Sequence, residues 1–363
     1  MNKQERQIAL DLLKKKNVVA VGRGTKKTDG TDTRQPAIVV SVARKVPLSA
    51  LSKRDRVPVV IKGRRTDVVE VGGEIKLRLD EPRFDKKRET MRKGHQVVET
   101  IEHRRLGYTM RDITARERPA HPGCSIGHKD ITAGTFGAVV YENQSGTAMI
   151  LSNNHVLANV NKGKVGDSIL QQGYYDGGRE PGDVIATLDD FVEIETVNSS
   201  DCPLTKLYIK MGDRLARIFG SRERFTSYRS ATNKVDCALA LPVDPADIDP
   251  FIPEIGSVTG VAAPEVGMEV MKRGRTTEIT RGKINSIDNI VNVNMGDGDY
   301  AIFEDQVIIS GIGGQFSAGG DSGSLILDKQ RRAVCLLFAG NDTITIGNDI
   351  RNVLEALDVR LMK

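Results

Sequence analysis

A serine in a glycine-rich turn is the first feature of this sequence that could carry out chemistry. Ser322 lies in the run Gly-Gly-Asp-Ser-Gly-Ser, and the apolar residues 325–327 follow it. A serine that attacks a carbonyl group needs a tight turn that exposes its Oγ and directs backbone N–H groups at the same point. Gly319, Gly320 and Gly323 would permit such a turn. A Gly/Ser-rich loop between two strands would look the same, so other residues must decide.

A nucleophilic serine also needs a base, and histidine is the usual base near neutral pH. Of the five histidines, His95 and His103 lie in a charged segment, and His121 and His128 lie at the start of a strand-rich region. His155 instead follows a strand-like apolar run and precedes Val-Leu-Ala, which places it at a strand end in an apolar setting. Taken alone it would be read as a structural histidine, but beside a candidate nucleophile it becomes the candidate base.

The base in turn needs a carboxylate that holds its tautomer and orientation. Asp236 opens the otherwise apolar run Cys-Ala-Leu-Ala-Leu, where a carboxylate is costly to bury unless it is hydrogen-bonded. Asp201 and Asp213 also lie between His155 and Ser322, but both fall in a segment with helical spacing. Asp236 is therefore the candidate orienting acid.

The segments LSNNHVLA, VDCALA and GGDSGSLIL, in the order His, Asp, Ser, resemble the trypsin/chymotrypsin-like serine peptidases. The likeness is greatest to the intracellular, disulfide-free type, which includes bacterial homologues and plant narrow-leaf-type proteases, and it covers about residues 121–360. The resemblance implies a chymotrypsin-like double β-barrel and a serine endopeptidase that works through an acyl-enzyme. It assigns His155 as general base and acid, Asp236 as its orienter and Ser322 as nucleophile.

The same resemblance assigns further roles around the nucleophile. The backbone N–H groups of Gly320 and Ser322 would form the oxyanion hole, and Asp321 would be the buried carboxylate that keeps the oxyanion loop in shape. Residues 336–340 look like the edge strand that pairs with an extended substrate through backbone hydrogen bonds. Phe316 falls near the floor of the specificity pocket, where no aspartate stands to favour Lys or Arg, so we expect a preference for small or medium apolar residues. The substrate-binding residues implied are Phe316, Phe338, Ala339 and Gly340.

Hydrophobic periodicity predicts a mainly β chain with some helix. Short strands separated by turns recur from about Cys124, beginning with a hairpin over residues 135–152. Apolar residues at helical spacing over 202–219 predict a helical insertion at about 191–232, and a capped helix is expected over 348–357. The first 80 residues predict a small α/β domain with a helix at 3–16, strands at 18–22, 37–42, 57–61 and 66–71, and a turn-rich connector at 25–36.

The distribution of charge divides the chain into two parts. The net charge is +5 overall, but residues 1–120 carry +14 and residues 121–363 carry −9. We therefore expect three units: the α/β domain over 1–80, a basic linker over 81–120, and the protease domain over 121–363. The basic part could dock on the acidic part of the same chain, restrain it until removed or displaced, or serve targeting or scaffolding. The competing hypothesis is a non-catalytic protease-fold adaptor whose basic region binds nucleic acid or an acidic protein.

Other classes of protein and partner are not expected. Aromatic residues for base stacking are scarce in the linker, so a nucleic-acid partner is disfavoured, and a protein or peptide substrate is the expected partner. No apolar run approaches the roughly 20 residues of a membrane span, and no secretion signal is recognised, so we expect a cytoplasmic protein. The four cysteines show neither paired spacing nor metal-ligand spacing, so we expect no disulfide framework. Cys124 lies between His121 and His128, but this spacing matches no strong zinc pattern, and we expect no metal or cofactor. The oligomeric state is left open.

Overall fold

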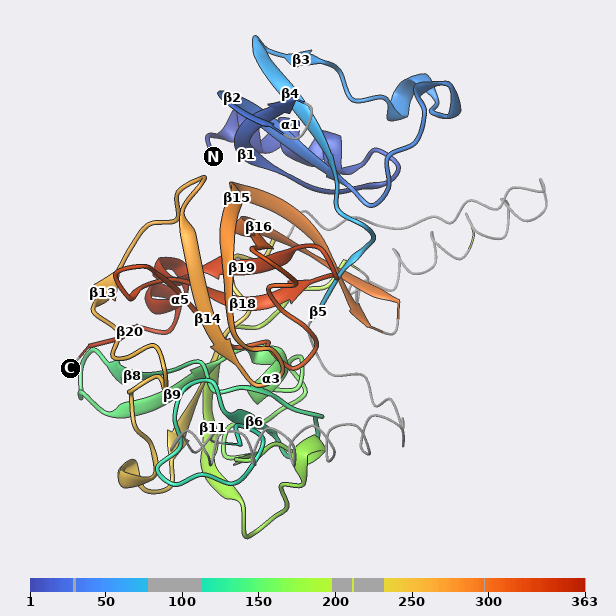
Figure 1. Cartoon of the computed structure of the whole chain (residues 1–363). Coiled ribbons are helices and arrows are strands. Elements are labelled where there is room, and N and C mark those ends of the chain that lie inside the picture. The colour runs from blue at the N-terminus through green and yellow to red at the C-terminus, as the bar shows by residue number, and fades with distance from the viewer. Residues whose placement is uncertain (29–30, 78–111, 198–210, 212–231, 297, 363) are drawn as a thin grey trace, which may run out of the picture.

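The computed structural model describes residues 1–28, 31–77, 112–197, 211, 232–296 and 298–362 (Figure 1). This part of the chain is mainly β and contains two sheets, which confirms the predicted fold class. The predicted linker over 81–120 falls largely on residues 78–111, and the helical insertion largely on 198–210 and 212–231, all outside the described residues. No described helix is long and apolar enough to cross a membrane.

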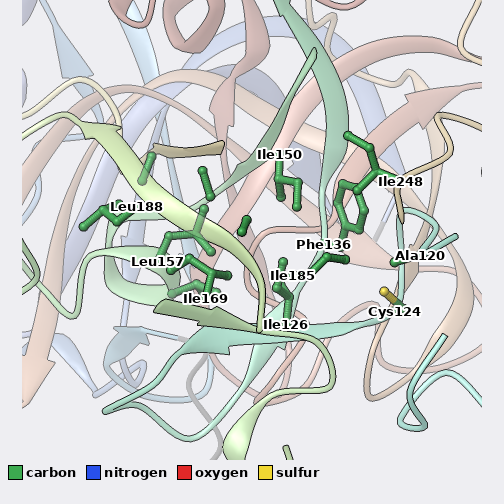
Figure 2. Close-up of a cluster of buried hydrophobic side chains, with 14 of the residues drawn as sticks. Ala120, Cys124, Ile126, Phe136, Ile150, Leu157, Ile169, Ile185, Leu188 and Ile248 are labelled. Carbon is green, nitrogen blue, oxygen red and sulfur yellow. The ribbon is translucent and has the colours of Figure 1, made fainter. Parts of the chain in front are cut away.

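The first sheet forms the lower body of the molecule in Figure 1, and its strands follow the order β20-β8-β9-β12-β11-β10-β6-β7. The predicted hairpin is present as β8 and β9, joined by a tight turn. Figure 2 shows the core inside this sheet, where Phe136, Ile150 and Ile185 meet from three segments. The strands of this sheet are β6 Ser125–His128, β7 Gly134–Thr135, β8 Ala138–Glu142, β9 Ala148–Ser152, β10 Ser168–Leu170, β11 Val184–Phe191, β12 Ala238–Pro242 and β20 Val359–Arg360.

The second sheet closes on itself. Its path runs β14-β17-β18-β19-β16-β15, and β15 pairs back with β14, so these six strands form a closed barrel. Closure removes the free edges that an open sheet would expose. Its elements are β13 Gly260–Val261, β14 Glu269–Gly274, β15 Glu278–Gly296, β16 Asp299–Gly311, β17 Leu325–Asp328, β18 Arg332–Gly340 and β19 Thr345–Asp349.

The N-terminal unit extends this barrel. Helix α1 begins with a capping box in which Asn2 and Glu5 satisfy each other's backbone N–H groups, and β1 pairs antiparallel with β15. One continuous sheet thus runs from the barrel through β1, β2, β4 and β3 (Figure 1, blue). The prediction of a turn-rich connector over 25–36 was wrong, because β1 and β2 extend into this segment and pair there as a long hairpin. The bounds are α1 Lys3–Leu13, β1 Val18–Thr28, β2 Thr31–Val42, β3 Val60–Ile61 and β4 Arg64–Glu70.

A short strand, β5 Ile75–Leu77, leads out of the N-terminal unit and enters the barrel sheet between β15 and β18. The residues before it are tied to the same region, since Thr343 Oγ1 donates to the carbonyl oxygen of Val71. The side chain of Ile75 is buried in the barrel core. The N-terminal unit is therefore joined to the barrel at two places, through β1 and through β5.

Two short helices, the segment 112–120 and four 3₁₀ turns complete the described part of the fold. The four-residue helix α3 Asn154–Leu157 follows β9 directly and lies where the two sheets meet (Figure 1). The predicted C-terminal helix is present as α5 Ile350–Ala356, which Asp349 caps and which buries Ile350 and Val353. Residues 112–120 pack on the first sheet, where Ala120 forms a bridge with Ile248. Single 3₁₀ turns occur at Leu48–Ala50, Lys53–Asp55, Tyr174–Asp176 and Pro245–Asp247.

Candidate active site

His155 and Asp236 are brought together as a buried pair. His155 lies in the first turn of α3, and its Nδ1 is 2.5 Å from Oδ2 of Asp236. The backbone N–H of His155 donates to the other carboxylate oxygen at 3.3 Å. Because a carboxylate oxygen accepts at this contact, Nδ1 is the donor of the pair. Nε2 is the ring nitrogen that is left for another partner.

Asp236 is itself held by two asparagines that the sequence analysis did not single out. Its carbonyl oxygen accepts from Nδ2 of Asn153 at 2.8 Å, and its backbone N–H donates to Oδ1 of Asn348 at 3.2 Å. Asn153 comes from the end of the first sheet, whereas Asn348 lies in β19 of the closed barrel. All three side chains are fully buried. The signal for Asn153 was its place in the LSNNHVLA motif, but nothing local to Asn348 pointed to this contact.

Ser322 belongs to the closed barrel and lies where the barrel meets the first sheet. It occupies the turn before β17, in which Gly320 and Gly323 have φ of +90° and +94°. A Cβ on Gly323 would lie 2.1 Å from Oγ of Ser152, so the tight packing here requires glycine. The backbone oxygen of Ser322 accepts from Thr135 at 2.7 Å, which pins the turn to the first sheet.

The hydroxyl of Ser322 is engaged by a backbone carbonyl group. Ser322 Oγ donates to the carbonyl oxygen of Phe338 at 3.2 Å. Within the described residues, His155 Nε2 is buried and has no hydrogen-bond partner. In proteases without substrate, catalytic hydrogen bonds are often long or misaligned, and the Oγ reaches another staggered position by rotation about one bond.

The region around the nucleophile contains two unengaged backbone donors. The N–H groups of Gly320 and Ser322 donate to no group in the part of the chain that the structure describes. The intervening Asp321 is fully buried and accepts several hydrogen bonds. These two N–H groups belong to the residues on either side of the buried Asp321.

The four residues expected to bind substrate fall into two environments. Phe316 is buried in the barrel core, where its ring lies against Gly282 and its carbonyl oxygen accepts from Thr280 at 2.7 Å. The other three form the end of β18, where the ring of Phe338 packs 4.8 Å from that of Phe303. Phe338 also sits at an irregularity in the β18–β19 ladder, which turns its carbonyl oxygen toward Ser322.

The edge expected to pair with substrate is already paired. Strand β17 accompanies β18 only as far as Leu336, which leaves one side of Ala339 and Gly340 without a partner from the barrel. There β5 pairs antiparallel with β18, with Leu77 opposite Ala339 and Lys76 opposite Gly340.

The side chains of all three candidate catalytic residues are fully buried.

His128 and the cysteines Cys124, Cys237 and Cys335 have ordinary structural environments, whereas His95, His103 and Cys202 lie outside the described residues. Nδ1 of His128 accepts from the backbone N–H of Asp130, and its Nε2 contacts Asp167 at 3.1 Å. Burial raises the pKa of Cys124 to about 12, and it raises the pKa of Cys237 and Cys335 well above the usual value. Buried thiols of this kind are unreactive. Across the described ranges, no group of three His, Cys, Asp or Glu is placed to hold a metal ion.

Sequence comparison finds a known peptidase family that part of the chain is similar to. Residues 186–341 match the model of Peptidase family S64, a range that includes Asp236 and Ser322. The same range contains most of the closed barrel. The chain has a trypsin/chymotrypsin-like serine protease fold. The match begins after His155 and does not include the histidine.

Solved structures of bacterial proteases are also similar to the chain. Protease A of Thermobifida fusca is 15% identical, with a TM-score of 0.41, and the alignment covers 67% of this chain and all of that one. The Nocardiopsis protease gives 15% identity and a TM-score of 0.42 over the same shares. A Cellulomonas bogoriensis chymotrypsin gives 15% identity and a TM-score of 0.39 over 66% of this chain and 97% of that one. A search of curated proteins gives no match.

Proposed function

We propose that this protein is a serine endopeptidase that hydrolyses peptide bonds through an acyl-enzyme, with His155, Asp236 and Ser322 as its triad. The observation that carries the proposal is the fully buried contact between His155 Nδ1 and Asp236. An apolar side chain of similar size would pack at least as well in that place, whereas a carboxylate at this contact orients the imidazole of His155.

The proposed reaction has two stages. His155 Nε2 takes the proton of Ser322 Oγ, which attacks the carbonyl carbon of the peptide bond. The negative charge that develops on the carbonyl oxygen accepts hydrogen bonds from the N–H groups of Gly320 and Ser322. The imidazolium then gives its proton to the leaving amine, and the acyl group stays on Oγ. Water, deprotonated by the same nitrogen, releases the acid and restores the hydroxyl.

The strand β5 supports a restrained state of this peptidase. Its antiparallel pairing with Ala339 and Gly340 uses the backbone positions that the substrate would need. We infer that an extended peptide binds there only after β5 leaves, so that the N-terminal region limits access to the triad. The N-terminal unit is held on the barrel by strand pairing and by ion pairs such as that between Arg6 and Glu304, at 2.6 Å.

For substrate preference we propose that Phe316, Phe338, Ala339 and Gly340 bound the site for the residue before the scissile bond. Position 316 holds phenylalanine and not an acidic residue, which supports a preference for small or medium apolar residues over Lys or Arg. A peptide library digested with the full-length protein and read by mass spectrometry would reveal the preference. Cleavage predominantly after Lys or Arg would contradict it.

A fluorophosphonate probe tests the proposed function directly. The probe reacts with an activated serine, so full-length protein should be labelled at neutral pH, and Ser322→Ala should not be. Ser145→Ala, in the exposed turn between β8 and β9, serves as the matched control and should label like the unaltered protein. No labelling, or labelling that persists in Ser322→Ala, would refute the triad.

The adaptor alternative predicts a different result. If the basic N-terminal region binds nucleic acid or an acidic protein, full-length protein should be retained on heparin with a steep dependence on salt. In the described N-terminal unit, several of the cations pair within the chain, among them Arg23 with Glu5 and Lys26 with Asp67. Retention together with an absence of Ser322-dependent labelling would favour the adaptor.

A further inference from the structure

The helix that carries His155 is too short to be stable by itself. Helix α3 contains only the four residues Asn154–Leu157, and isolated helices much longer than this are marginal in water. The side chain of its N-cap residue, Asn153, accepts no hydrogen bond from the helix. The position of His155 therefore depends on contacts that hold α3 from outside the helix.

One of these contacts joins Asn154, the residue directly before His155, to Asn161. Oδ1 of Asn154 accepts from the backbone N–H of Asn161 at 3.1 Å, and its Nδ2 donates to Oδ1 of Asn161 at 2.7 Å. The same Nδ2 also donates to the carbonyl oxygen of Val192 at 2.7 Å. Asn154 is fully buried, whereas Asn161 is exposed. The first residue of α3 is thus fixed by a side chain that lies outside the core.

The backbone that leads to Asn161 is strained. Asn159, Val160 and Asn161 have φ of +49°, +52° and +64°, so three consecutive residues are left-handed. Residues other than glycine adopt this conformation singly, and for a β-branched residue such as Val160 it is unfavourable. Strain of this kind persists only where surrounding contacts impose it, and it is concentrated at functional sites. Here the strained turn brings the amide of Asn161 back onto Asn154.

The amide of Asn161 also holds the segment that follows β11. Its Oδ1 accepts from the N–H of Ile194 at 3.0 Å, and its Nδ2 donates to the carbonyl oxygen of Ile194 at 2.8 Å. Asn233 holds the next residue, Glu195, through the same two backbone groups, at 2.8 and 2.9 Å. Asn233 in turn forms a bridge with Phe303 of β16, and the side chain of Ile194 is buried in the barrel core. These contacts connect α3 with the closed barrel.

We propose that Asn161 is a positioning residue for the serine peptidase reaction, which acts through Asn154 to hold α3 in place against the closed barrel. The inference rests on the proposed function. His155 belongs to α3 and Ser322 to the barrel, so proton transfer between them depends on how the two parts are held together. Asn161 touches neither residue, but it is bonded both to α3 and to the segment fastened on the barrel.

The test replaces Asn161 with glycine in the full-length protein. Glycine adopts a left-handed backbone without strain, so this change removes the amide and keeps the turn. Asn159→Gly is the matched control, because it lies in the same left-handed run and its side chain makes no hydrogen bond with the described residues. Misplacement of reacting groups by about 1 Å can cost about 100-fold in rate. We expect Asn161→Gly to lower kcat for a library peptide about 10- to 100-fold with KM little changed, and Asn159→Gly to leave both unchanged.

A second variant covers the case in which Asn161→Gly does not fold. Asn161→Asp has nearly the same volume and also tolerates a left-handed backbone. Its second carboxylate oxygen would face the carbonyl oxygen of Ile194, where the amide now donates, so the link to the barrel is lost. Asn161→Asp should therefore show a loss of kcat similar to that of Asn161→Gly.

Hydrogen exchange gives a readout that does not require activity. Loosening of α3 should speed exchange of the backbone amides in peptides that span residues 153–158, measured by mass spectrometry. Asn161→Gly should exchange faster than the unaltered protein in this segment, and Asn159→Gly should not. This distinguishes a change in how α3 is held from a general loss of stability, which would speed exchange in every part of the chain.

Four results would overturn the proposal. These are folded Asn161 variants with unchanged kcat, an effect confined to KM, an equal loss in Asn159→Gly, and unchanged exchange over residues 153–158 in Asn161→Gly. If the unaltered protein shows no Ser322-dependent labelling, the proposed function itself fails. If it is labelled and the Asn161 variants match it in kcat, only the role of Asn161 fails.

Discussion

Weakening β5 should activate the peptidase toward peptides. The most effective single change is Ile75→Ala, because Ile75 is only 1% exposed and packs in the barrel core with Phe338 and Ala339, beside the edge that β5 occupies. Truncation of a buried isoleucine to alanine costs about 2–5 kcal/mol. If that cost falls on the paired state of β5, the fraction of molecules with a free edge rises at least about 30-fold, since about 1.4 kcal/mol corresponds to a factor of ten.

The assay compares two reactions of the same protein. Hydrolysis of an extended peptide, chosen from those cleaved in the library, requires the free edge of β18. Labelling by a small fluorophosphonate requires only Ser322 and its immediate surroundings. We expect Ile75→Ala to increase kcat/KM for the peptide far more than it increases the labelling rate. Leu12→Ala, which removes a comparable buried side chain from the N-terminal unit, is the control.

Two results would refute this reasoning. If Ile75→Ala folds and hydrolyses the peptide no faster than the unaltered protein, then β5 does not compete with substrate. If Leu12→Ala produces the same increase, the effect comes from general loosening of the N-terminal unit and not from the pairing of β5. Circular dichroism at the assay temperature establishes that both variants are folded.

Three further predictions concern the triad, its turn and the buried thiols. Asp236→Asn should fold but lose about 10⁴ in kcat, because an amide no longer holds the required tautomer of His155; single-turnover kinetics with the library peptide measure this, and a loss below tenfold would contradict it. Gly323→Ala should prevent folding, because the new Cβ would lie 2.1 Å from Oγ of Ser152; a soluble variant with unchanged thermal unfolding would contradict that. Burial raises the pKa of Cys124 from 9.0 to about 12, so between these values the unfolded chain binds fewer protons than the folded one. Stability should therefore fall as pH rises through that window, by up to about 1.4 kcal/mol per pH unit, and Cys124→Ala should show a shallower decline in urea titrations. Identical slopes would count against this assignment.

Much of the fold could be predicted from the sequence because its signals are local. The Lys-Gly turn between β3 and β4, the apolar alternation of β8 and β9, and the cap of α5 each depend on residues a few positions apart. The connector over 25–36 was predicted wrongly for the same reason. Its turn residues favour a loop, but pairing of β1 with both β2 and β15 extends the hairpin through them.

By itself the sequence determined the chemical groups of the candidate site. Three features are recognisable from neighbouring residues, and so is their order: Ser322 in a glycine-rich turn, His155 at a strand end and Asp236 before an apolar strand. Each belongs to a motif of six to nine residues, so no knowledge of distant contacts was needed to propose it.

Only the tertiary structure decided how those groups are supported and covered. Asn348 holds Asp236 across 112 positions, and Lys272 reaches Asp321 from another strand of the barrel. Strand β5 reaches the edge of β18 from more than 260 positions away. Such contacts depend on the closure of the barrel and on the register of strands remote in sequence. Their free energy appears only once the sheet has formed, so no local pattern encodes them.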